Sequence, residues 1–157
     1  MMMKKSILLF SILFMGILSF AQTTDDYIEI TRSVLQVEKK AAIAEVMVLT
    51  EAEAEVFWPL YNELETKRHT VQTKRIQIIK DFAEHYEALS DERADQIWTD
   101  YIQYKEEILK LNKQYFKKFK KIMSAGKAVK YFQAENKIAV LIDFQLSAEI
   151  PFIETKQ

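Results

Sequence analysis

The sequence predicts an all-α fold, an elongated bundle of about four helices in which two long antiparallel helices form a hairpin. Three observations lead to this prediction. Only two of the 157 residues are Gly and two are Pro, whereas a β-rich fold needs many turn residues. Apolar residues recur at spacings of three and four over long segments, as on one face of a helix. A helix-start pattern also occurs three times along the chain.

The repeated pattern combines an N-terminal helix cap with an apolar-aromatic helical face. Thr50, Ser90 and Ser124 each follow a Leu or Met and precede an Ala by four residues. A hydroxyl at this position accepts a hydrogen bond from a free N–H of the first helical turn. We expect Trp58 and Trp98 to be core anchors, because aromatic residues at helical spacing usually face a core. The motif in the two clearest copies consists of Leu49, Thr50, Trp58, Tyr61, Leu89, Ser90, Trp98 and Tyr101.

Residues 1–21 resemble a secretory signal peptide. Lys4 and Lys5 form its charged start, a short apolar stretch follows, and Ser19-Phe20-Ala21 offers small residues for cleavage before Gln22. An uncleaved membrane anchor is the alternative. Cleavage would leave 20 basic residues (22 − 2) against 23 acidic ones, a net charge of −3. Residues 22–157 are then expected to form a single all-helical domain in the periplasm, without stable membrane insertion.

The first two helices are expected from about Tyr27 to Met47 and from Glu51 to about Ala88. Pro59 lies near the second turn of the second helix and should bend it rather than break it. The apolar positions of the first helix are Ile30, Val34, Val37, Ala41, Ala44 and Val48. Those of the second are Phe57, Leu60, Leu64, Val71, Ile78 and Phe82.

The last two helices are expected from Asp91 to about Met123 and from about Ala125 to Ser147, before Pro151. The third has the clearest apolar face, with Ile97, Tyr101, Tyr104, Ile108, Leu111, Tyr115, Phe119 and Ile122. The fourth carries Ala128, Phe132, Ile138, Leu141, Ile142 and Phe144. At ~1.5 Å per residue, helices two and three are each about 50 Å long. Such rods leave apolar side chains uncovered, so a homodimer of antiparallel long helices is expected.

Several kinds of chemistry find no support in the composition. The chain has no Cys and a formal charge of −1, which argues against disulfides, thiolate chemistry and nucleic-acid binding. It has neither a phosphate-binding Gly loop nor a nucleophile motif. His69 and His85 lie about 24 Å apart on a continuous helix, although Asp81, Glu84 and His85 could meet at one ion. We therefore expect no enzyme, no cofactor and no metal site.

The third helix also carries a basic surface. Lysines crowd its second half and alternate there with aromatic residues. We predict a client-binding surface formed by Lys113, Phe116, Lys117, Lys120 and Lys121. Phe116 lies one step off the buried face and is the best candidate for an exposed apolar contact. Such a surface attracts acidic, partly apolar partners. The alternative is an ordinary solvated helix face.

The duplicated segments resemble the paired LTxxQ motifs of the Spy/CpxP family. The similarity lies in Leu49-Thr50-Glu51-Ala52-Glu53 and Leu89-Ser90-Asp91-Glu92-Arg93, with Glu and Arg in place of the final Gln. It extends over the signal peptide and most of the remaining chain, in helix order and repeat spacing. That family comprises small periplasmic all-α proteins of envelope stress.

The resemblance implies a function in binding other proteins. The expected function is that of an ATP-independent periplasmic chaperone or stress-response protein, acting on unfolded or partner proteins. An adaptor that docks on an inner-membrane stress-signalling protein, without general chaperone activity, is the alternative. A purely structural envelope protein is the third possibility.

Overall fold

The computed structural model describes residues 26–153, and over these residues the protein is an all-α bundle. Four α-helices and one 3₁₀ turn occupy 91% of the described residues, and no strand occurs among them. The predicted fold class is therefore confirmed. The predicted signal peptide, residues 1–21, lies outside the described residues.

The helix boundaries agree closely with the sequence-based expectation. The first helix covers residues 26–47. The others are α2 (Glu51–His85), α3 (Asp91–Ile122) and α4 (Ala125–Glu149), with the 3₁₀ turn η1 (Tyr86–Ala88) after α2. Pro59 lies within α2 on an exposed position, and the helix continues past it.

The three predicted caps all form. The side chains of Thr50, Ser90 and Ser124 accept hydrogen bonds from the backbone N–H three residues later. Thr50 also completes a capping box, because its backbone N–H donates to Glu53 at 3.1 Å. Each cap satisfies donors that the first turn would otherwise leave unpaired. The repeat thus sets where three of the helices begin.

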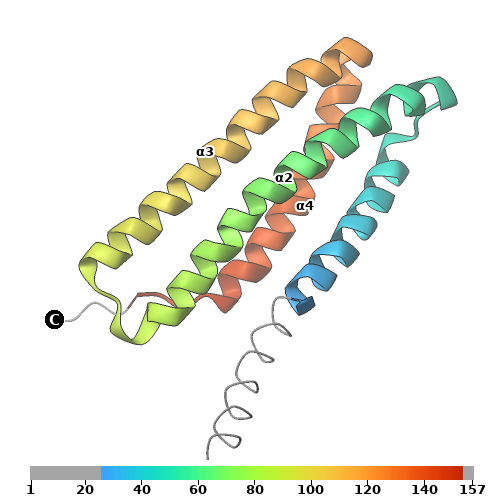
Figure 1. Cartoon of the computed structure of the whole chain (residues 1–157). Helices are drawn as coiled ribbons and strands as arrows, with labels where there is room; N and C mark the ends of the chain where they lie inside the picture. Colours follow the sequence, from blue (N-terminus) through green and yellow to red (C-terminus); the bar gives the residue numbers. More distant parts are fainter. Residues whose placement is uncertain (1–25, 154–157) are drawn as a thin grey trace, which may run out of the picture. The chain divides into compact units, whose positions relative to one another are not determined.

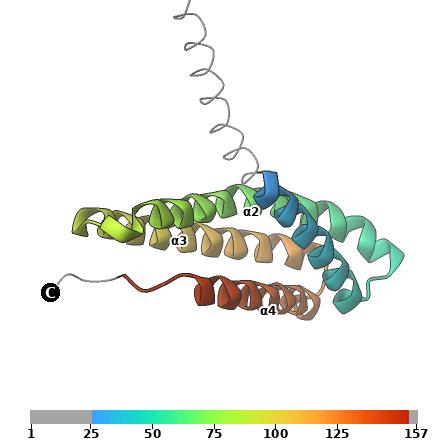
Figure 2. The ribbon, with the colours of Figure 1, turned by 90° about the horizontal axis from the view of Figure 1, so that it is seen from below.

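The chain divides into two compact units, residues 1–42 and residues 43–157. In the second unit α2 and α3 run antiparallel and side by side, and α4 turns back along them (Figure 1). Figure 2 shows α4 covering one side of the α2–α3 hairpin. The hairpin expected from the two long helices is therefore present within one chain.

The apolar core of the second unit lies at the end where α2 and α4 begin and α3 finishes. Its rings pack edge-on or tilted, with the Phe119 and Tyr131 centroids 4.6 Å apart and those of Phe57 and Tyr131 5.3 Å apart. Such geometry stabilises aromatic pairs beyond the area they bury. The buried apolar residues of this cluster are Ile43, Met47, Phe57, Tyr61, Leu64, Tyr115, Phe119, Ala128, Tyr131 and Ala134.

Parts of two predicted apolar faces are exposed instead of buried. On α4, Leu141 and Phe144 are 66% and 73% exposed. The whole series from the first helix is also exposed: Ile30, Val34, Val37, Ala41, Ala44 and Val48. Periodicity identified residues that share a face, but it did not show which of them another helix covers.

Candidate functional site

The candidate site is the outer side of α3, opposite the face that packs on the core. The inner face buries Tyr104, Tyr115 and Phe119. The outer row, as we call it, follows spacings of four, seven, four, four and three, which keep its members on one side of the helix. It consists of Trp98, Ile102, Leu109, Lys113, Lys117 and Lys120. From Trp98 to Lys120 the row is about 33 Å long, at ~1.5 Å of rise per residue.

The first half of the outer row is apolar and open to solvent. Trp98 is 63% exposed, and Leu109 and Ile102 are 52% and 42% exposed. The expectation that Trp98 is a core anchor is therefore wrong. Ile97 and Trp98 stand at the positions that Phe57 and Trp58 have in the first copy of the repeat, but Trp98 is exposed. Its ring contacts Tyr101 at 5.5 Å between centroids.

Trp58, in the first copy of the repeat, behaves as expected. It is partly buried and packs against the core cluster. Its ring lies 5.0 Å from that of Phe57 and 5.3 Å from that of Tyr61, both edge-on. The two tryptophans of the repeat thus have different surroundings.

The second half of the outer row is basic. Lys113, Lys117 and Lys120 are exposed, as is the neighbouring Lys121, and none forms an ion pair with another residue of 26–153. Lys118, on the opposite side of α3, is different because it pairs with Glu63 at 2.8 Å. The lysines predicted from the sequence are thus exposed.

Phe116 does not project into solvent as expected. It is half-buried and packs edge-on against Phe132 of α4, with 5.6 Å between the ring centroids. The Lys120 Nζ lies 4.8 Å from the centre of the Phe116 ring, a distance at which a cation is attracted to the aromatic face. Phe116 therefore packs α3 against α4 and holds Lys120 over its ring. The exposed apolar residues of the outer row are instead Trp98, Ile102 and Leu109.

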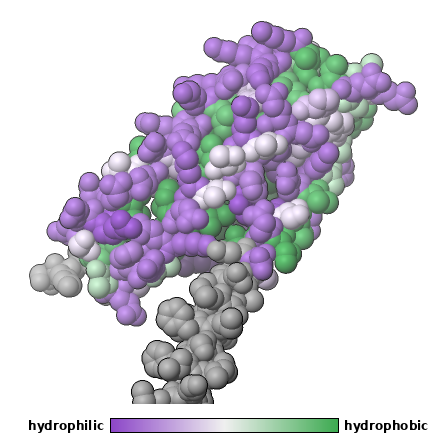
Figure 3. Space-filling view, in the orientation of Figure 1, coloured by the Kyte–Doolittle hydropathy of each residue, from purple (hydrophilic) through white to green (hydrophobic). Residues whose placement is uncertain are grey.

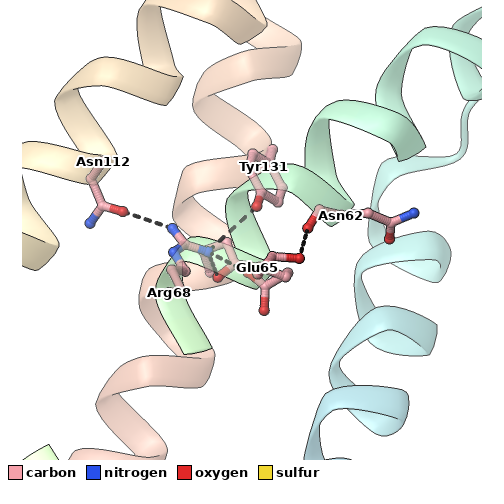
Figure 4. A network of polar contacts seen from close by, with 7 residues as sticks. Asn62, Glu65, Arg68, Asn112 and Tyr131 are labelled. Atoms are coloured by element: carbon pink, nitrogen blue, oxygen red, sulfur yellow. Dashed lines mark hydrogen bonds and ion pairs between the residues drawn. The ribbon is translucent and has the colours of Figure 1, made fainter. Parts of the chain in front are cut away.

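A buried polar cluster ties α3 to the other two helices. The Arg68 guanidinium of α2 donates to Glu65 Oε1 at 2.9 Å, to Glu135 of α4, and to Asn112 Oδ1 of α3 at 2.7 Å (Figure 4). Burial lowers the pKa of Arg68, but Glu135 and the other anionic neighbours carry it above its usual value. Arg68 thus remains charged and contacts all three helices.

Buried tyrosines surround this cluster. The Arg68 Nη1 lies 3.5 Å from the Tyr131 hydroxyl. Burial, with the nearby carboxylates of Glu65 and Glu135, raises the pKa of both Tyr61 and Tyr131. The buried Tyr61 hydroxyl has no hydrogen-bond partner among residues 26–153. These phenols therefore stay neutral at physiological pH.

This cluster was not predicted from the sequence, although the sequence contains a signal for it. Arg68 continues the series Phe57, Tyr61 and Leu64 at spacings of four, three and four, which placed a charged residue on the buried face. A charge on such a face requires a partner. The identity of the partners could not be read from one sequence, because it depends on how the helices align.

Ion pairs hold the other end of the hairpin. Asp143 of α4 binds Arg75 of α2 at 2.6 Å and Lys105 of α3 at 3.0 Å. Burial raises the pKa of Asp143, but the hydrogen bonds from Lys105 and Arg75 bring it below its usual value. Arg93 pairs with Asp81 nearby. Partly exposed pairs of this kind contribute little to stability.

The cleft between α2 and α3 at this end is polar. It has a volume of about 530 Å³, and its lining includes three cations and three carboxylates, namely Lys74, Lys80, Arg93, Asp81, Glu84 and Asp100. No three His, Cys, Asp or Glu side chains of the described residues are placed to hold a metal ion. Asp81 instead contacts Arg93 and His85.

The surface in the orientation of Figure 1 is mixed in character. Figure 3 shows hydrophilic side chains over most of this face, with hydrophobic atoms between them. Among the helices that the structure describes, none combines the length and apolar character needed to cross a membrane. Comparison with protein-family models, with curated proteins and with solved structures found no match for this chain.

Proposed function

We propose that this protein is an ATP-independent chaperone or stress-response protein of the bacterial periplasm, which binds unfolded or partner proteins on the outer row of α3. Large exposed apolar side chains and lysines without ion pairs lie next to one another on one side of α3, and this observation supports the proposal. Trp98 and Leu109 are more than half exposed, and Lys113 and Lys117 follow them on the same side.

The two halves of the outer row suit two stages of binding. Unpaired lysines attract acidic segments and raise the rate of encounter. Apolar contacts with Trp98, Ile102 and Leu109 then retain a chain that exposes its own apolar residues. Further exposed residues on α4, Val140, Leu141 and Phe144, extend the apolar surface that the second unit offers. The resemblance to the Spy/CpxP family supports the same proposal.

An aggregation assay tests the proposed function. A chemically denatured client is diluted into buffer with the purified protein at varied stoichiometry, and light scattering is recorded. The proposal expects suppression by the wild-type protein and weaker suppression by the variant Trp98→Ser/Leu109→Ser. If this variant suppressed client aggregation fully, the outer row would not be the binding surface. No suppression of several unrelated clients, with capture of one membrane signalling protein, would favour the adaptor.

A charge-reversal pair tests the basic half. The variant Lys113→Glu/Lys117→Glu/Lys120→Glu should associate with client more slowly than the wild-type protein. The matched control Lys67→Glu/Lys130→Glu/Lys137→Glu makes the same change in net charge at exposed lysines outside the row. Stopped-flow rates at low and high salt separate the two, because exposed charges are screened within about 10 Å at ~0.1 M salt. Equal slowing of both variants would show that only net charge matters.

A further inference from the structure

Exposed apolar residues of α4 point to the same side of the second unit as the outer row of α3. Val140 and Phe144 of α4 are 56% and 73% exposed. Val140 lies nine residues after Tyr131, whose hydroxyl contacts Arg68 of α2. Phe144 lies nine residues after Glu135, which binds the same guanidinium. Nine residues make about two and a half turns, at ~3.6 residues per turn, so both side chains point away from α2.

The apolar half of the outer row points away from α2 as well. Trp98 lies nine residues before Glu107, which forms an ion pair with Lys74 of α2. Leu109 lies nine residues before Lys118, which pairs with α2 in the same way. The helices α3 and α4 pack against each other, and both lie below α2 in the view of Figure 2. The exposed apolar residues of the two helices therefore share the face of the α3–α4 pair that is turned away from α2.

These residues also lie at the same level along the bundle. The Lys105 Nζ and the Asp143 Oδ2 are 3.0 Å apart and mark one level on α3 and α4. Leu109 and Val140 lie four and three residues from this pair, both towards the end where α3 finishes and α4 begins. Their levels thus differ by about 2 Å, at ~1.5 Å of rise per residue, so one ligand can contact both. The α3–α4 face, as we call it, consists of Trp98, Ile102, Leu109, Val140 and Phe144.

The α3–α4 face continues into positive charge at one end. Lys113 and Lys117 follow Leu109 on the outer row and are exposed. From residue 113 to residue 137 the chain has one carboxylate, that of Glu135, and it is buried. A partner therefore has to bring its own carboxylates to this end of the face. A second copy of the same face has none to offer there, and its lysines would be repelled.

We infer that the partner's segment is an amphipathic helix of ~22 residues, with carboxylates in its first turns and an apolar stripe along its length. Such a helix matches the length of the outer row, about 33 Å. Its own hydrogen bonds satisfy its backbone, whereas an extended chain would press unpaired N–H and C=O groups against an apolar face. Carboxylates in the first turns also complement the helix dipole. The inference rests on the proposed function, because it names the kind of segment that the outer row binds.

Binding of two labelled peptides to the full chain tests the inference. The first peptide is an amphipathic helix of ~22 residues, with Glu beside the stripe in its first two turns and Leu at spacings of three and four. The second has the same composition, but its Leu residues alternate with polar ones, so it keeps the charge and loses the helical stripe. Fluorescence anisotropy should show at least about tenfold tighter binding of the first peptide, with a gain of helix in circular dichroism. Equal affinities would overturn the inference.

Substitutions on α4 test whether the binding face includes both helices. Val140→Ser/Phe144→Ser should weaken binding of the helical peptide about tenfold, because it removes the apolar contacts of α4. The control Val46→Ser/Val56→Ser removes two side chains elsewhere that are 40% and 45% exposed, and it should bind like wild type. Circular dichroism confirms that both variants keep their helices. An α4 variant that binds like wild type, or a control that binds as weakly as the α4 variant, would contradict the two-helix face.

Two further measurements separate the inference from the proposed function. Wild-type protein that suppresses aggregation of unfolded clients without binding the helical peptide would keep the proposed function and refute the inference. Protein that binds the peptide on the α3–α4 face but suppresses no aggregation would support the inference and contradict a general chaperone. Vesicles of anionic lipid serve as the last probe. If they bound wild-type protein more tightly than the peptide does, and bound the α4 variant weakly, the partner would be a membrane surface and the inference would be wrong.

Discussion

The two ends of the second unit are built on different principles. The aromatic end, residues 43–68 and 111–138, contains every buried side chain described except Tyr104. The open end, residues 69–110 and 139–153, is held mainly by partly exposed ion pairs such as those of Asp143. Apolar packing provides most of the stability of a small domain, and exposed ion pairs provide little. The aromatic end therefore provides most of the stability of the second unit, and the apolar half of the outer row lies on the open end.

The duplicated tryptophans show the same difference at the level of single residues. Trp58 and Trp98 occupy equivalent positions in two copies of one motif, eight residues after Thr50 and Ser90. Trp58 packs against the core cluster, whereas Trp98 is 63% exposed. The motif therefore sets where a helix starts, while the neighbouring helices decide whether its aromatic residues are covered.

The largest effect is expected for truncation of a core ring. Phe119 is fully buried and contacts the rings of Phe57, Tyr131 and Phe132. Phe119→Ala should lower the free energy of unfolding by about 3–5 kcal/mol, through lost burial and a cavity. Urea denaturation monitored by circular dichroism measures the loss. Leu109 lies at an exposed position of the same helix. If Phe119→Ala lowered the free energy of unfolding by less than Leu109→Ala does, the division into two ends would be contradicted.

Removal of the buried Arg68 guanidinium should lower the free energy of unfolding almost as much. Arg68→Met should destabilise the protein by about 3–5 kcal/mol, because it removes the buried cation that Glu65 and Glu135 bind. Replacing the three charged residues together, as Arg68→Met/Glu65→Leu/Glu135→Leu, should restore much of the loss. The same denaturation experiment compares them. If the triple variant were less stable than Arg68→Met, the buried charges would contribute net stability to the fold. Their attraction would then do more than offset the cost of burying them.

Alkaline pH should destabilise the aromatic end selectively. Burial raises the pKa of Tyr131 above its usual value, so the unfolded chain loses this proton first as pH rises. The stability associated with this tyrosine is fully present below pH ~10 and decreases above it by about 1.4 kcal/mol per pH unit. Tyr131→Phe should flatten the pH dependence by roughly this slope above pH ~11, where the phenol of the unfolded chain is almost fully ionised. An unchanged slope would mean that the phenol is not buried.

A smaller effect, of opposite sign, is expected at Val48. This residue follows the first helix with φ of 46°, a left-handed conformation that is unfavourable for a β-branched side chain. Val48→Gly should raise stability by about 1 kcal/mol, because Gly adopts this conformation without strain. The control Val46→Gly, within the helix, should lower it by roughly 1 kcal/mol. Destabilisation by both would show that Val48 is not strained.

Sequence analysis predicted the helices well because local signals define their ends. Thr50, Ser90 and Ser124 each bear a hydroxyl that caps the next turn, and the three helices begin as predicted. The exposure of the basic surface at Lys113 and Lys117 could be foreseen for the same local reason, since both lie opposite Tyr115 on the helix.

Contacts between helices could not be predicted in the same way. The periodicity around Trp98 and Val34 shows which residues share a face, but it does not show whether another helix covers that face. Phe116 was misjudged because Phe132, more than a dozen residues further on, folds back over it. The partners of Arg68 depend on helix alignment for the same reason.

Trp98→Ala separates binding from stability most sharply, since Trp98 is exposed on the open end and is proposed to bind clients without stabilising the fold. The free energy of unfolding and the affinity for an unfolded client are measured on the same preparation. We expect stability within about 0.5 kcal/mol of wild type, as for other exposed sites. Affinity should fall about tenfold, since an interface Trp that is a binding hot spot contributes ~1.4 kcal/mol or more. Unchanged affinity, or a loss of stability of several kcal/mol, would contradict the account.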